Sequence, residues 1–429
     1  MLKSMLFGGP SGSGSWVVTL ATNLNSIYYS SKTNGIALAS DGTVYLTGST
    51  PLTTGGQIGA VLAKYSPSGD ILWQKIVEIN NQLIFGRPIS ASNDGSIYTC
   101  FWFRPNNTSS FEMAKFDSSG GQVWNKVVST SSPSADCKSI HIAKDGSVYA
   151  CGSLGISSSY TYAFVVKFSA SGGLLWQKKL GIEKKYTSSE YIFVSQDGSV
   201  FIFTTAPNAV AKYDSSGNLQ WQKGISKGTS IYAGGVSAGD DGSAYAVFTC
   251  PGDKYALFVA KFNASGTVQW EKRIYGSIDI YGTGVSVGHD GSLYVCGRVH
   301  DSAQGKDSVL LAKYDSSGNL HWQKVFSGGA LDYVYSVDVD PDGSVYFGGY
   351  TNSTGESCSF LAKMTEDDLS RNDAISFGPF SLSTSTYNAE NASITVSAGE
   401  LISDDSSAGL LSRSYTISDG SFSSTLYKG

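Results

Sequence analysis

Two short blocks of sequence alternate along most of this chain, and their repetition restricts the fold more than any other feature. The first block, x-Asp-Gly-(Ser/Thr)-x-(Tyr/Phe), occurs seven times at intervals of 44 to 53 residues. The second, (Ala/Val)-Lys-(Phe/Tyr)-x-x-Ser-Gly-x-x-x-Trp, follows each of the first six copies. A period near 50 residues indicates an array of like structural units. The aspartates of the first block are Asp41, Asp94, Asp145, Asp197, Asp241, Asp290 and Asp342.

Each block predicts a β-hairpin. Around Asp290, apolar and polar residues alternate on both sides of an Asp-Gly pair, and Gly accepts the positive φ that a tight turn requires. The Ser-Gly pair of the second block predicts another hairpin for the same reason. Two hairpins form a four-stranded unit of about 50 residues, which is the content of one propeller blade.

The two ends of the array predict how the ring closes. The seventh copy has the Asp342 turn and a strand at 360–363, but no Trp strand follows it. At the other end, the segment 14–20 precedes the first hairpin and carries Trp16. We expect this segment to pair with the last blade, which removes the open edge of the array. The sequence therefore predicts an all-β fold, a seven-bladed β-propeller over 14–364, preceded by a flexible lead at 1–13.

The repeat pattern ends after Met364. Residues 365–429 begin with a charged linker and continue as a Ser/Thr-rich stretch with short alternating segments. About 65 residues of such low apolar content would form a marginal core by themselves. We expect a small C-terminal β domain, or a tail that docks on the propeller or on another subunit.

Composition excludes several classes of protein. Charged residues make up 15% of the chain, aromatic residues 12%, and the formal net charge is −5. A nucleic-acid binder usually carries a basic face, and a membrane helix needs about 18 consecutive apolar residues. The N-terminal apolar stretch, residues 5–7, is too short for a signal peptide. We expect no nucleic-acid partner, no membrane insertion and no classical export.

The Cys, His and acidic residues do not form a recognisable metal or catalytic motif. The six Cys lack CxxC and zinc spacings, and three of them fall six residues after a turn Asp, which favours buried, reduced thiols. The four His are scattered over different repeat positions. The stretch 338–343 imitates the start of a calcium loop, but Gly349 occupies the place of its bidentate Glu. We expect no cofactor and no metal.

The recurring Trp and Lys residues allow two interpretations each. The Trp residues could form a ladder for ligand stacking, and the Lys residues a cationic ring. A Trp at the same place beside a turn in every blade is better explained as a packing wedge between blades. A Lys on the preceding strand is better explained by a stem that covers an aromatic ring while its ammonium group reaches water.

At these blocks the chain resembles bacterial and viral seven-bladed propeller repeats that carry similar DGSVY and AKYDSSGNLxW blocks. The resemblance covers about 350 residues and implies the fold, while such propellers serve many unrelated roles. The second block is also similar to the tryptophan-docking motif of quinoprotein propellers. The segment 211–221 matches that motif in length, but it has Asp214 one place late, Ser216 for the usual Thr and no adjacent Cys pair.

One face of such a propeller is expected to carry variable loops. The Asp-Gly and Ser-Gly turns leave one face, and the connections from second to third and from fourth to first strands leave the other. The latter are rich in Tyr, Asn, Ser and Gly, a composition that suits recognition of a glycan or protein. As candidate binding residues on this loop face we take Trp102, Tyr160, Tyr162, Tyr186, Tyr232, Tyr281 and Tyr333.

Three functions remain open. The first is a non-enzymatic structural and recognition protein of a phage particle, made in the host cytoplasm, with its tail and N-terminal lead contacting other virion proteins. The second is an extracellular or cell-surface propeller that binds a glycan. The third is an enzyme with its site at the channel mouth, where Asp338 and Asp340 are the exceptional acidic residues. We favour the first, and hence a protein without catalytic activity.

Overall fold

The computed structural model describes most of the chain. The described residues are 3–8, 14–21, 35–51, 58–78, 83–103, 109–130, 134–157, 160–181, 186–206, 208–227, 231–328, 331–352, 358–393, 395–397, 403–404, 415–419 and 423–428. The chain divides into two compact units. Unit 1 comprises 1–32, 65–70 and 226–395, and unit 2 comprises 33–64, 71–225 and 396–429.

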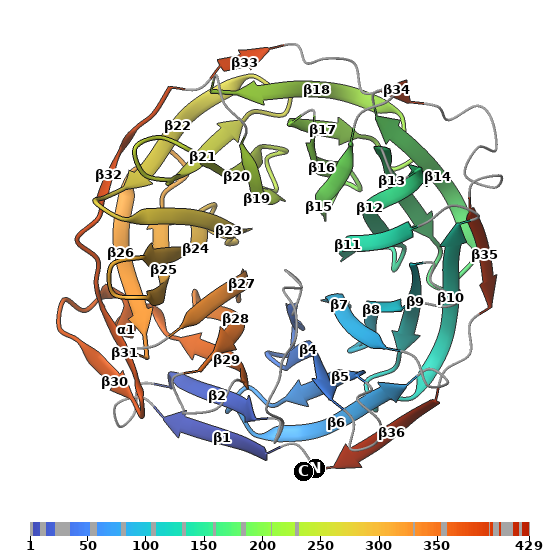
Figure 1. Cartoon of the computed structure of the whole chain (residues 1–429), viewed down its shortest axis with the longest axis horizontal. Coiled ribbons are helices and arrows are strands. Elements are labelled where there is room, and N and C mark those ends of the chain that lie inside the picture. Colours follow the sequence, from blue (N-terminus) through green and yellow to red (C-terminus); the bar gives the residue numbers. More distant parts are fainter. Residues whose placement is uncertain are drawn as a thin grey trace. The chain divides into compact units, whose positions relative to one another are not determined.

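The described residues form a seven-bladed β-propeller of antiparallel blades, as the repeat predicts. Three blades belong to unit 1. Blade 5 contains β19 (Tyr232–Ala238), β20 (Ala244–Cys250), β21 (Ala256–Phe262) and β22 (Val268–Tyr275). Blade 6 contains β23 (Asp279–Val287), β24 (Leu293–Asp301), β25 (Lys306–Tyr314) and β26 (Leu320–Ser327). Blade 7 contains β27 (Asp332–Val339), β28 (Val345–Thr351), β29 (Cys358–Met364) and β2 (Trp16–Ala21). In Figure 1 blade 5 can be followed from β19, nearest the middle of the picture, outward to β22.

The other four blades lie mainly in unit 2. Blade 1 contains β3 (Ile36–Leu38), β4 (Val44–Pro51), β5 (Ile58–Tyr65) and β6 (Ile71–Glu78). Blade 2 contains β7 (Ile84–Ala91), β8 (Ile97–Phe103), β9 (Ser110–Phe116) and β10 (Gln122–Thr130). Blade 3 contains β11 (Ser134–Ile142), β12 (Val148–Ser157), β13 (Tyr160–Phe168) and β14 (Leu174–Gly181). Blade 4 contains β15 (Ser188–Val194), β16 (Val200–Thr205), β17 (Ala209–Tyr213) and β18 (Leu219–Ser226).

Blade 7 is completed by the N-terminal strand, which confirms the predicted closure. β2 pairs antiparallel with β29, and Trp16 lies opposite Lys363 in the register. Phe360 lies opposite Thr19 in the same pair of strands. The missing fourth strand of the last repeat is therefore supplied by the beginning of the propeller sequence.

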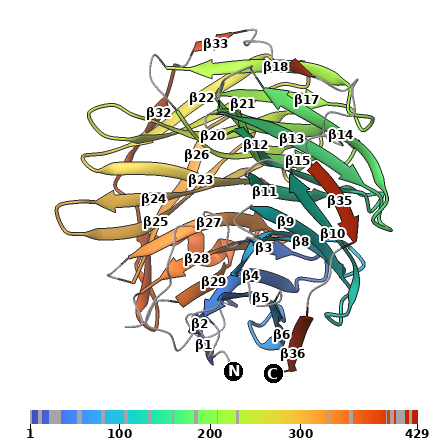
Figure 2. The ribbon, with the colours of Figure 1, turned by 45° about the vertical axis from the view of Figure 1, so that its right-hand side comes forward.

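A fifth strand borders every blade. The sequence predicted a tail that could dock on the propeller, but not that each blade would gain a strand. On blade 7 it is β1 (Lys3–Gly8), which pairs with β2. On the other blades it comes from the C-terminal segment, which adds its strands to blades 6, 5, 4, 3, 2 and 1 in that order along the chain. The segment is thus a tail that docks on the propeller by strand addition. Figure 2 shows two of its strands, β35 beside β10 and β36 beside β6.

The tail strands are short. They are β31 (Phe380–Thr384), flanked by β30 (Ile375–Phe377), on β26; β32 (Asn388–Asn391) on β22; β33 (Thr395–Ser397) on β18; β34 (Ser403–Asp404) on β14; β35 (Tyr415–Asp419) on β10; and β36 (Ser423–Lys428) on β6. The helix α1 (Glu366–Ser370) links the last propeller strand to this tail. Among the described residues, no helix has the length and hydropathy needed to cross a membrane.

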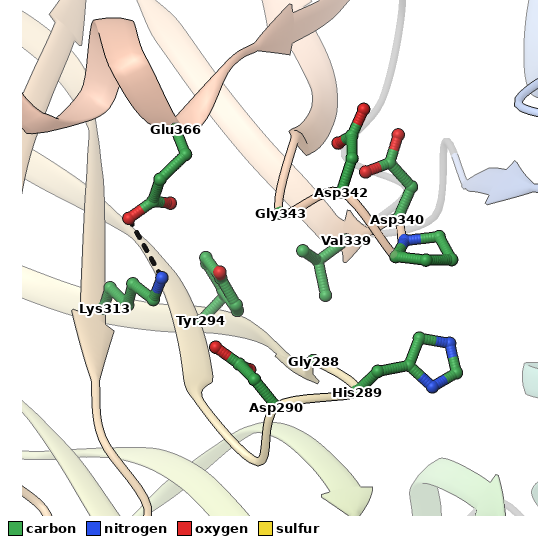
Figure 3. A pocket seen from close by; sticks show the side chains of 11 residues that line it. Gly288, His289, Asp290, Tyr294, Lys313, Val339, Asp340, Asp342, Gly343 and Glu366 are labelled. Atoms are coloured by element: carbon green, nitrogen blue, oxygen red, sulfur yellow. Dashed lines mark hydrogen bonds and ion pairs between the residues drawn. The ribbon is translucent and has the colours of Figure 1, made fainter.

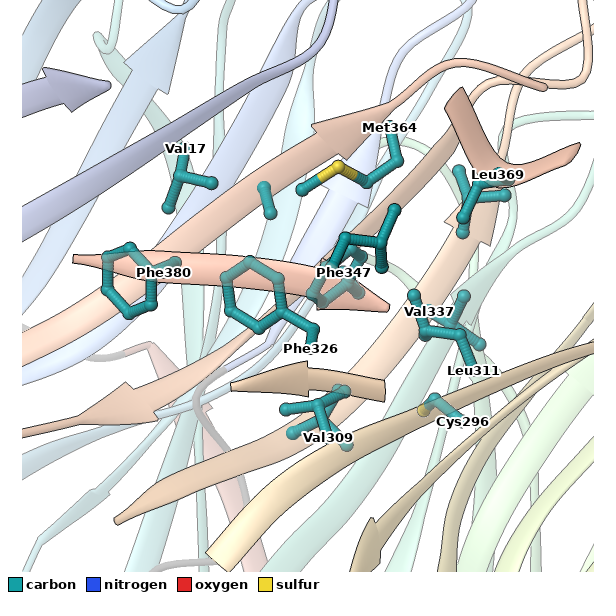
Figure 4. Packing of buried hydrophobic residues seen from close by; sticks show 14 of the residues in the cluster. Val17, Cys296, Val309, Leu311, Phe326, Val337, Phe347, Met364, Leu369 and Phe380 are labelled. Atoms are coloured by element: carbon teal, nitrogen blue, oxygen red, sulfur yellow. The ribbon is translucent and has the colours of Figure 1, made fainter. Parts of the chain in front are cut away.

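The first part of the tail is packed into the core of unit 1. Phe377, Phe380 and Leu382 are at most 1% exposed and join the apolar cluster of blades 6 and 7. The ring of Phe380 stacks on that of Phe326 at 5.1 Å, and Figure 4 shows both rings beside Phe347. By contrast, β32 is largely exposed, so main-chain pairing rather than apolar burial holds it.

The first sequence block forms the expected tight turns. In blade 1, Oδ1 of Asp41 accepts hydrogen bonds from the backbone N–H of Thr43 at 2.9 Å and from its hydroxyl at 2.6 Å. Gly42 follows with φ = +76°, where an L side chain would be strained. The Asp therefore satisfies the backbone of the turn and the Gly permits its conformation, which explains why both residues recur.

The recurring Trp and Lys residues join neighbouring blades. In blade 1, Nε1 of Trp73 and Nζ of Lys64 both donate to the Ser118 carbonyl oxygen in the Ser-Gly turn of blade 2, at 3.2 and 3.3 Å. The Lys64 ammonium also lies 5.2 Å from the centre of the Tyr45 ring, against which Trp73 packs. The same joint occurs between blades 3 and 4 and between blades 5 and 6. The wedge interpretation of the Trp is therefore correct at these joints. The prediction for the Lys is correct only in part, because it covers an aromatic ring but its ammonium group bonds to the neighbouring turn instead of reaching water, and Lys167 and Lys261 are buried.

The joint between blades 6 and 7 uses a side chain instead of a turn. Blade 7 has no Ser-Gly turn, because its chain enters α1 after β29 and its fourth strand comes from the N-terminus. In place of the turn carbonyl, Oε1 of Glu366 accepts from Nζ of Lys313 at 2.9 Å and from Nε1 of Trp322 at 3.3 Å. The first residue of α1 thus replaces the missing turn.

Candidate binding site on the loop face

The candidate site lies at the loop ends of three neighbouring blades in unit 1. Tyr232 begins β19, Tyr281 is near the start of β23, and Tyr333 is near the start of β27. Because strand direction alternates within a blade, the starts of these strands lie at the end opposite the Asp-Gly turns. This is the loop face expected from the sequence, and it holds three of the candidate residues.

Aromatic rings and one guanidinium group make a continuous row across the three blades, which we call the tyrosine row. It consists of Tyr232, Tyr255, Tyr281, Arg298, Tyr333 and Tyr350. The ring centres of Tyr232 and Tyr255 are 6.0 Å apart, and those of Tyr255 and Tyr281 are 4.9 Å apart. At the far end, the rings of Tyr333 and Tyr350 are 5.9 Å apart. Tyr232 is 49% exposed.

Arg298 fills the middle of the row. Its guanidinium carbon lies 5.6 Å from the ring centre of Tyr281 and 4.5 Å from that of Tyr333. A guanidinium plane against aromatic rings gains cation–π attraction, of about 0.5–2 kcal/mol per contact. Arg298 therefore connects blade 6 to blade 7 while presenting hydrogen-bond donors between two apolar rings.

A buried carboxylate fixes the orientation of Arg298. Oδ1 of Asp307, a residue only 1% exposed, accepts from Nε of Arg298 at 2.6 Å. Nδ1 of His300 lies 2.8 Å from the same oxygen and 3.1 Å from Nη2 of Arg298. Because Nδ1 can either donate to Asp307 or accept from Arg298, the tautomer of His300 is coupled to this ion pair. The positive charge of Arg298 is thus balanced within the site.

The tyrosines around Arg298 remain neutral phenols near neutral pH. Burial raises the pKa of Tyr335 to about 12, and burial followed by the charge of Asp279 raises the pKa of Tyr281. Burial likewise raises the pKa of Tyr333, although the nearby Arg298 acts in the opposite direction. A neutral phenol can both donate and accept a hydrogen bond, as recognition of hydroxyl groups requires.

The remaining candidate residues lie in unit 2 and outside this row. The ring of Trp102 packs on Phe85 at 5.4 Å. The ammonium group of Lys179 lies 4.3 Å from the centre of the Tyr162 ring. Tyr186 is 56% exposed. Tyr160 is the first residue of β13, and its side chain is outside the described part of the structure. Within unit 1 the structure therefore brings Tyr232, Tyr281 and Tyr333 together, while the other four candidate residues belong to unit 2.

Sequence reasoning missed Tyr255, Arg298 and Tyr350, although the repeat contains a signal for two of them. Tyr281 lies nine residues before Asp290 and Arg298 lies eight residues after it, and the two are opposite each other in the register of β23 and β24. Tyr333 and Tyr350 occupy the same two positions around Asp342. Comparing this pair of positions between repeats would have identified the partners. Tyr255 has no such signal.

A cavity lies beside the Asp-Gly turns of blades 6 and 7, opposite the loop face and close to Asp338 and Asp340. It is a cavity of about 160 Å³ whose lining includes Asp290, Asp340, Asp342 and the Lys313–Glu366 pair, as Figure 3 shows. Burial raises the pKa of Asp340 to about 6, and a hydrogen bond with Asp340 lowers the pKa of Asp342 to about 2. Asp338 instead accepts from the Ser286 hydroxyl at 3.2 Å.

The acidic lining of this cavity does not form a metal centre. Within the residues that the structure describes, no group of three or more His, Cys, Asp or Glu side chains is arranged to hold a metal ion. The carboxyl groups of Asp340 and Asp342 are hydrogen-bonded to each other, which favours one shared proton and a single negative charge on the pair. Lys313 and Glu366 form an ion pair and neutralise each other. We therefore place the candidate site on the loop face.

Comparisons with known proteins do not identify a family. No family model matches the chain, and no curated protein matches it. Among solved structures, virginiamycin B lyase from Staphylococcus aureus is 12% identical, with a TM-score of 0.49, covering 85% of this chain and 99% of its own. A protein of unknown function from Bacteroides caccae is 15% identical, with a TM-score of 0.41, covering 65% and 92%.

A puromycin hydrolase is also similar, at 10% identity and a TM-score of 0.36, covering 75% of this chain and 58% of its own. Likenesses of this extent carry no argument about the activity of this chain, so the expectation of a protein without catalytic activity stays a prediction.

Proposed function

We propose that the protein is a recognition protein that binds a carbohydrate through the tyrosine row. The observation that carries this proposal is Arg298, which Asp307 holds between the rings of Tyr281 and Tyr333. Sugar rings offer an apolar face of C–H groups bordered by hydroxyl groups, and this pattern matches aromatic rings bordered by fixed polar groups. The ordering cost of such a site is small, because its side chains already hold one another in place.

Binding to immobilised and free glycans tests this proposal. We expect the wild-type protein to bind a subset of glycans on an array, and Arg298→Ala and Tyr333→Ala to lower the affinity about tenfold or more. The matched control is Tyr275→Ala, because Tyr275 also packs under an arginine, Arg273, but lies on the outer strand β22. If no glycan binds, or if the control loses binding equally, the proposal fails.

The place of the protein in a phage particle is a separate proposal. It depends on the resemblance of the two blocks to bacterial and viral propeller repeats and on the tail and N-terminal lead as possible attachment points. Its test is co-purification of the chain with assembled particles across a density gradient. Release of a soluble chain from the producing cells, with none in particles, would favour a secreted or cell-surface glycan binder instead.

A catalytic function is the second candidate, and one pair of residues favours it. His300 lies beside the buried Asp307, and a carboxylate in that place can orient an imidazole as a general base. If the bound saccharide is chemically changed, His300→Gln should abolish turnover and retain binding. If the saccharide is recovered intact after long incubation, the protein is a binder without this activity.

A further inference from the structure

We infer that the tyrosine row takes an extended, neutral saccharide chain along its length, rather than the terminal sugar of a branched glycan. This inference rests on the proposed function and names the kind of carbohydrate. The structural basis is that successive contacts lead from blade 5 through blade 6 to blade 7. The contacts run from Tyr232 to Tyr255 and Tyr281, across Arg298, and on to Tyr333 and Tyr350.

The row has similar chemistry on both sides of its centre. Tyr281 faces Arg298 from blade 6 and Tyr333 faces it from blade 7, so an apolar ring stands on each side of the polar group. A single sugar would use one ring and a few donors. A chain of linked sugars presents apolar faces and hydroxyl groups repeatedly, and can therefore use rings on both sides at once.

The end of the row is open rather than closed. Tyr232 is 49% exposed, and its ring meets Tyr255 edge-on at an interplanar angle of 61°. Tyr255 is held by the backbone: its N–H donates to Oδ1 of Asp279 at 3.0 Å. A ligand that passes over Tyr281 can therefore continue over Tyr255 to Tyr232 and out into solvent.

The charges along the row favour a neutral chain. Arg298 is the row's cation, and Asp307 compensates it through the 2.6 Å contact with Nε. A second carboxylate, that of Asp279, accepts a hydrogen bond from the backbone N–H of Tyr255 at 3.0 Å and, after burial, contributes to the raised pKa of Tyr281. An acidic polysaccharide would meet two carboxylates and one arginine, so it would be repelled more than attracted.

A length series of oligosaccharides tests the inference. The probes are glucose, mannose, galactose and xylose oligosaccharides from two to eight units, measured by titration calorimetry. For the sugar that binds, we expect the affinity to rise with length, about threefold to tenfold for each newly contacted ring, and then to level off. Uronic-acid oligomers of equal length should bind more weakly.

Two variants locate the chain on the row. Tyr232→Ala should lower the affinity for the longest oligomer threefold to tenfold and leave that for the disaccharide unchanged, because Tyr232 lies at the blade 5 end of the row, away from Arg298. Tyr232→Phe, which retains the ring, should bind the longest oligomer nearly as the wild type does. Arg298→Ala should weaken both ligands. The melting temperature of each variant checks that it remains folded.

The possible failures are distinguishable. If the disaccharide binds as tightly as the octasaccharide and Tyr232→Ala is without effect, the extended-chain inference is wrong while carbohydrate binding stands. If uronic-acid oligomers bind more tightly than neutral ones, the inference of a neutral ligand is wrong. If no saccharide of any length binds, both the inference and the proposed function are wrong.

Discussion

At the scale of single residues, the joint between blades depends on one indole and one ammonium group that meet the same carbonyl oxygen. Trp73 is 5% exposed and is part of the apolar cluster of blades 1 and 2, while its Nε1 donates to Ser118. The joint therefore combines apolar burial with a hydrogen bond from the indole to the turn of the next blade.

These two contributions can be separated at Trp73. We expect Trp73→Phe to lower the free energy of unfolding by about 1–2 kcal/mol, since it removes the hydrogen bond and part of the ring. Trp73→Ala should cost about 3–5 kcal/mol, because it also leaves a cavity. Chemical unfolding measures both, with Leu72→Ala as the control, since Leu72 is 44% exposed. Equal losses for Phe and Ala would contradict the packing role.

Glu112 predicts a specific dependence of stability on pH. The residue is 1% exposed, Asn125 donates to its Oε1, and burial raises its pKa from 4.5 to about 7. An acid with a raised pKa in the folded protein is stabilising in its protonated form, so its contribution is complete below pH 4.5 and is lost as pH rises through about 7. The loss should be about 3 kcal/mol.

The comparison with Glu112→Gln isolates this contribution from that of other groups. The difference in unfolding free energy between wild type and variant should grow between pH 4.5 and 7, with the variant becoming the more stable protein. Glu78→Gln, at an exposed position, should show no such trend. His141, whose pKa burial lowers to about 4, acts in the opposite direction but equally in both proteins. A constant difference across this range would refute the prediction.

Cys100 and Cys137 are expected to form a disulfide under oxidising conditions. Both thiols are fully buried, and their sulfur atoms lie 2.7 Å apart between β8 and β11. Oxidised glutathione would accept the two electrons, and the reaction should be slow because the thiols must first become accessible. Peptide mass spectrometry should find this pair crosslinked, with Cys250 and Cys296 remaining unpaired. Absence of the crosslink after oxidation of the native protein would contradict the prediction.

At the scale of elements, the tail contains two parts with different anchoring. The β30–β31 hairpin carries four apolar side chains into the core of unit 1, whereas β32 adds its backbone and a few polar contacts. Among the latter, Oε1 of Glu390 accepts from Nε of Arg273 at 2.6 Å, an exposed pair that contributes little. The hairpin should therefore supply most of the stabilisation from the tail in this unit.

Truncations test this division. A chain that ends at Tyr387, and so lacks β32 but retains the hairpin, should unfold at nearly the same denaturant concentration as the full chain in the transition of unit 1. A chain that ends at Asp373 should be clearly less stable, because it lacks Phe377, Phe380 and Leu382. Phe380→Ala in the full chain should cost about 3–5 kcal/mol, and Ser376→Ala, at an exposed position of β30, less than about 0.5 kcal/mol. Equal losses for the two truncations would disprove the division.

The sequence predicted the elements that repeat and missed those that do not. The Asp-Gly and Ser-Gly hairpins follow from local turn chemistry, and the pairing of Trp16 with the last blade follows from counting strands. The tail strands contain two to six residues, and their main-chain pairing with the blades requires no repeated side-chain pattern that the sequence could reveal. Loop composition does not point to Arg298, because this residue lies within the strand β24 and not in a loop.

At the scale of the whole molecule, the seven-bladed propeller places its candidate site where the repeat is least uniform. The positions around each Asp-Gly turn are nearly constant because the turn and the joint require them. The positions nine before and eight after the turn Asp are free of that requirement, and in blades 5 to 7 they hold Tyr232, Tyr281 with Arg298, and Tyr333 with Tyr350. The repeat therefore determines the scaffold and leaves these two positions of each blade free to vary for recognition.

The pairing of β2 with β29 also constrains how the molecule is made. A ribosome that adds about 5–20 residues per second needs on the order of half a minute between these two strands. Throughout that time β2, Trp16–Ala21, can pair with β1 on one side, but its other neighbour, β29, has not yet been translated. An unpaired strand edge can pair with other chains, so a high expression level should favour aggregation. Slower translation initiation, or a chaperone that binds the unfolded chain, should improve the yield of folded protein.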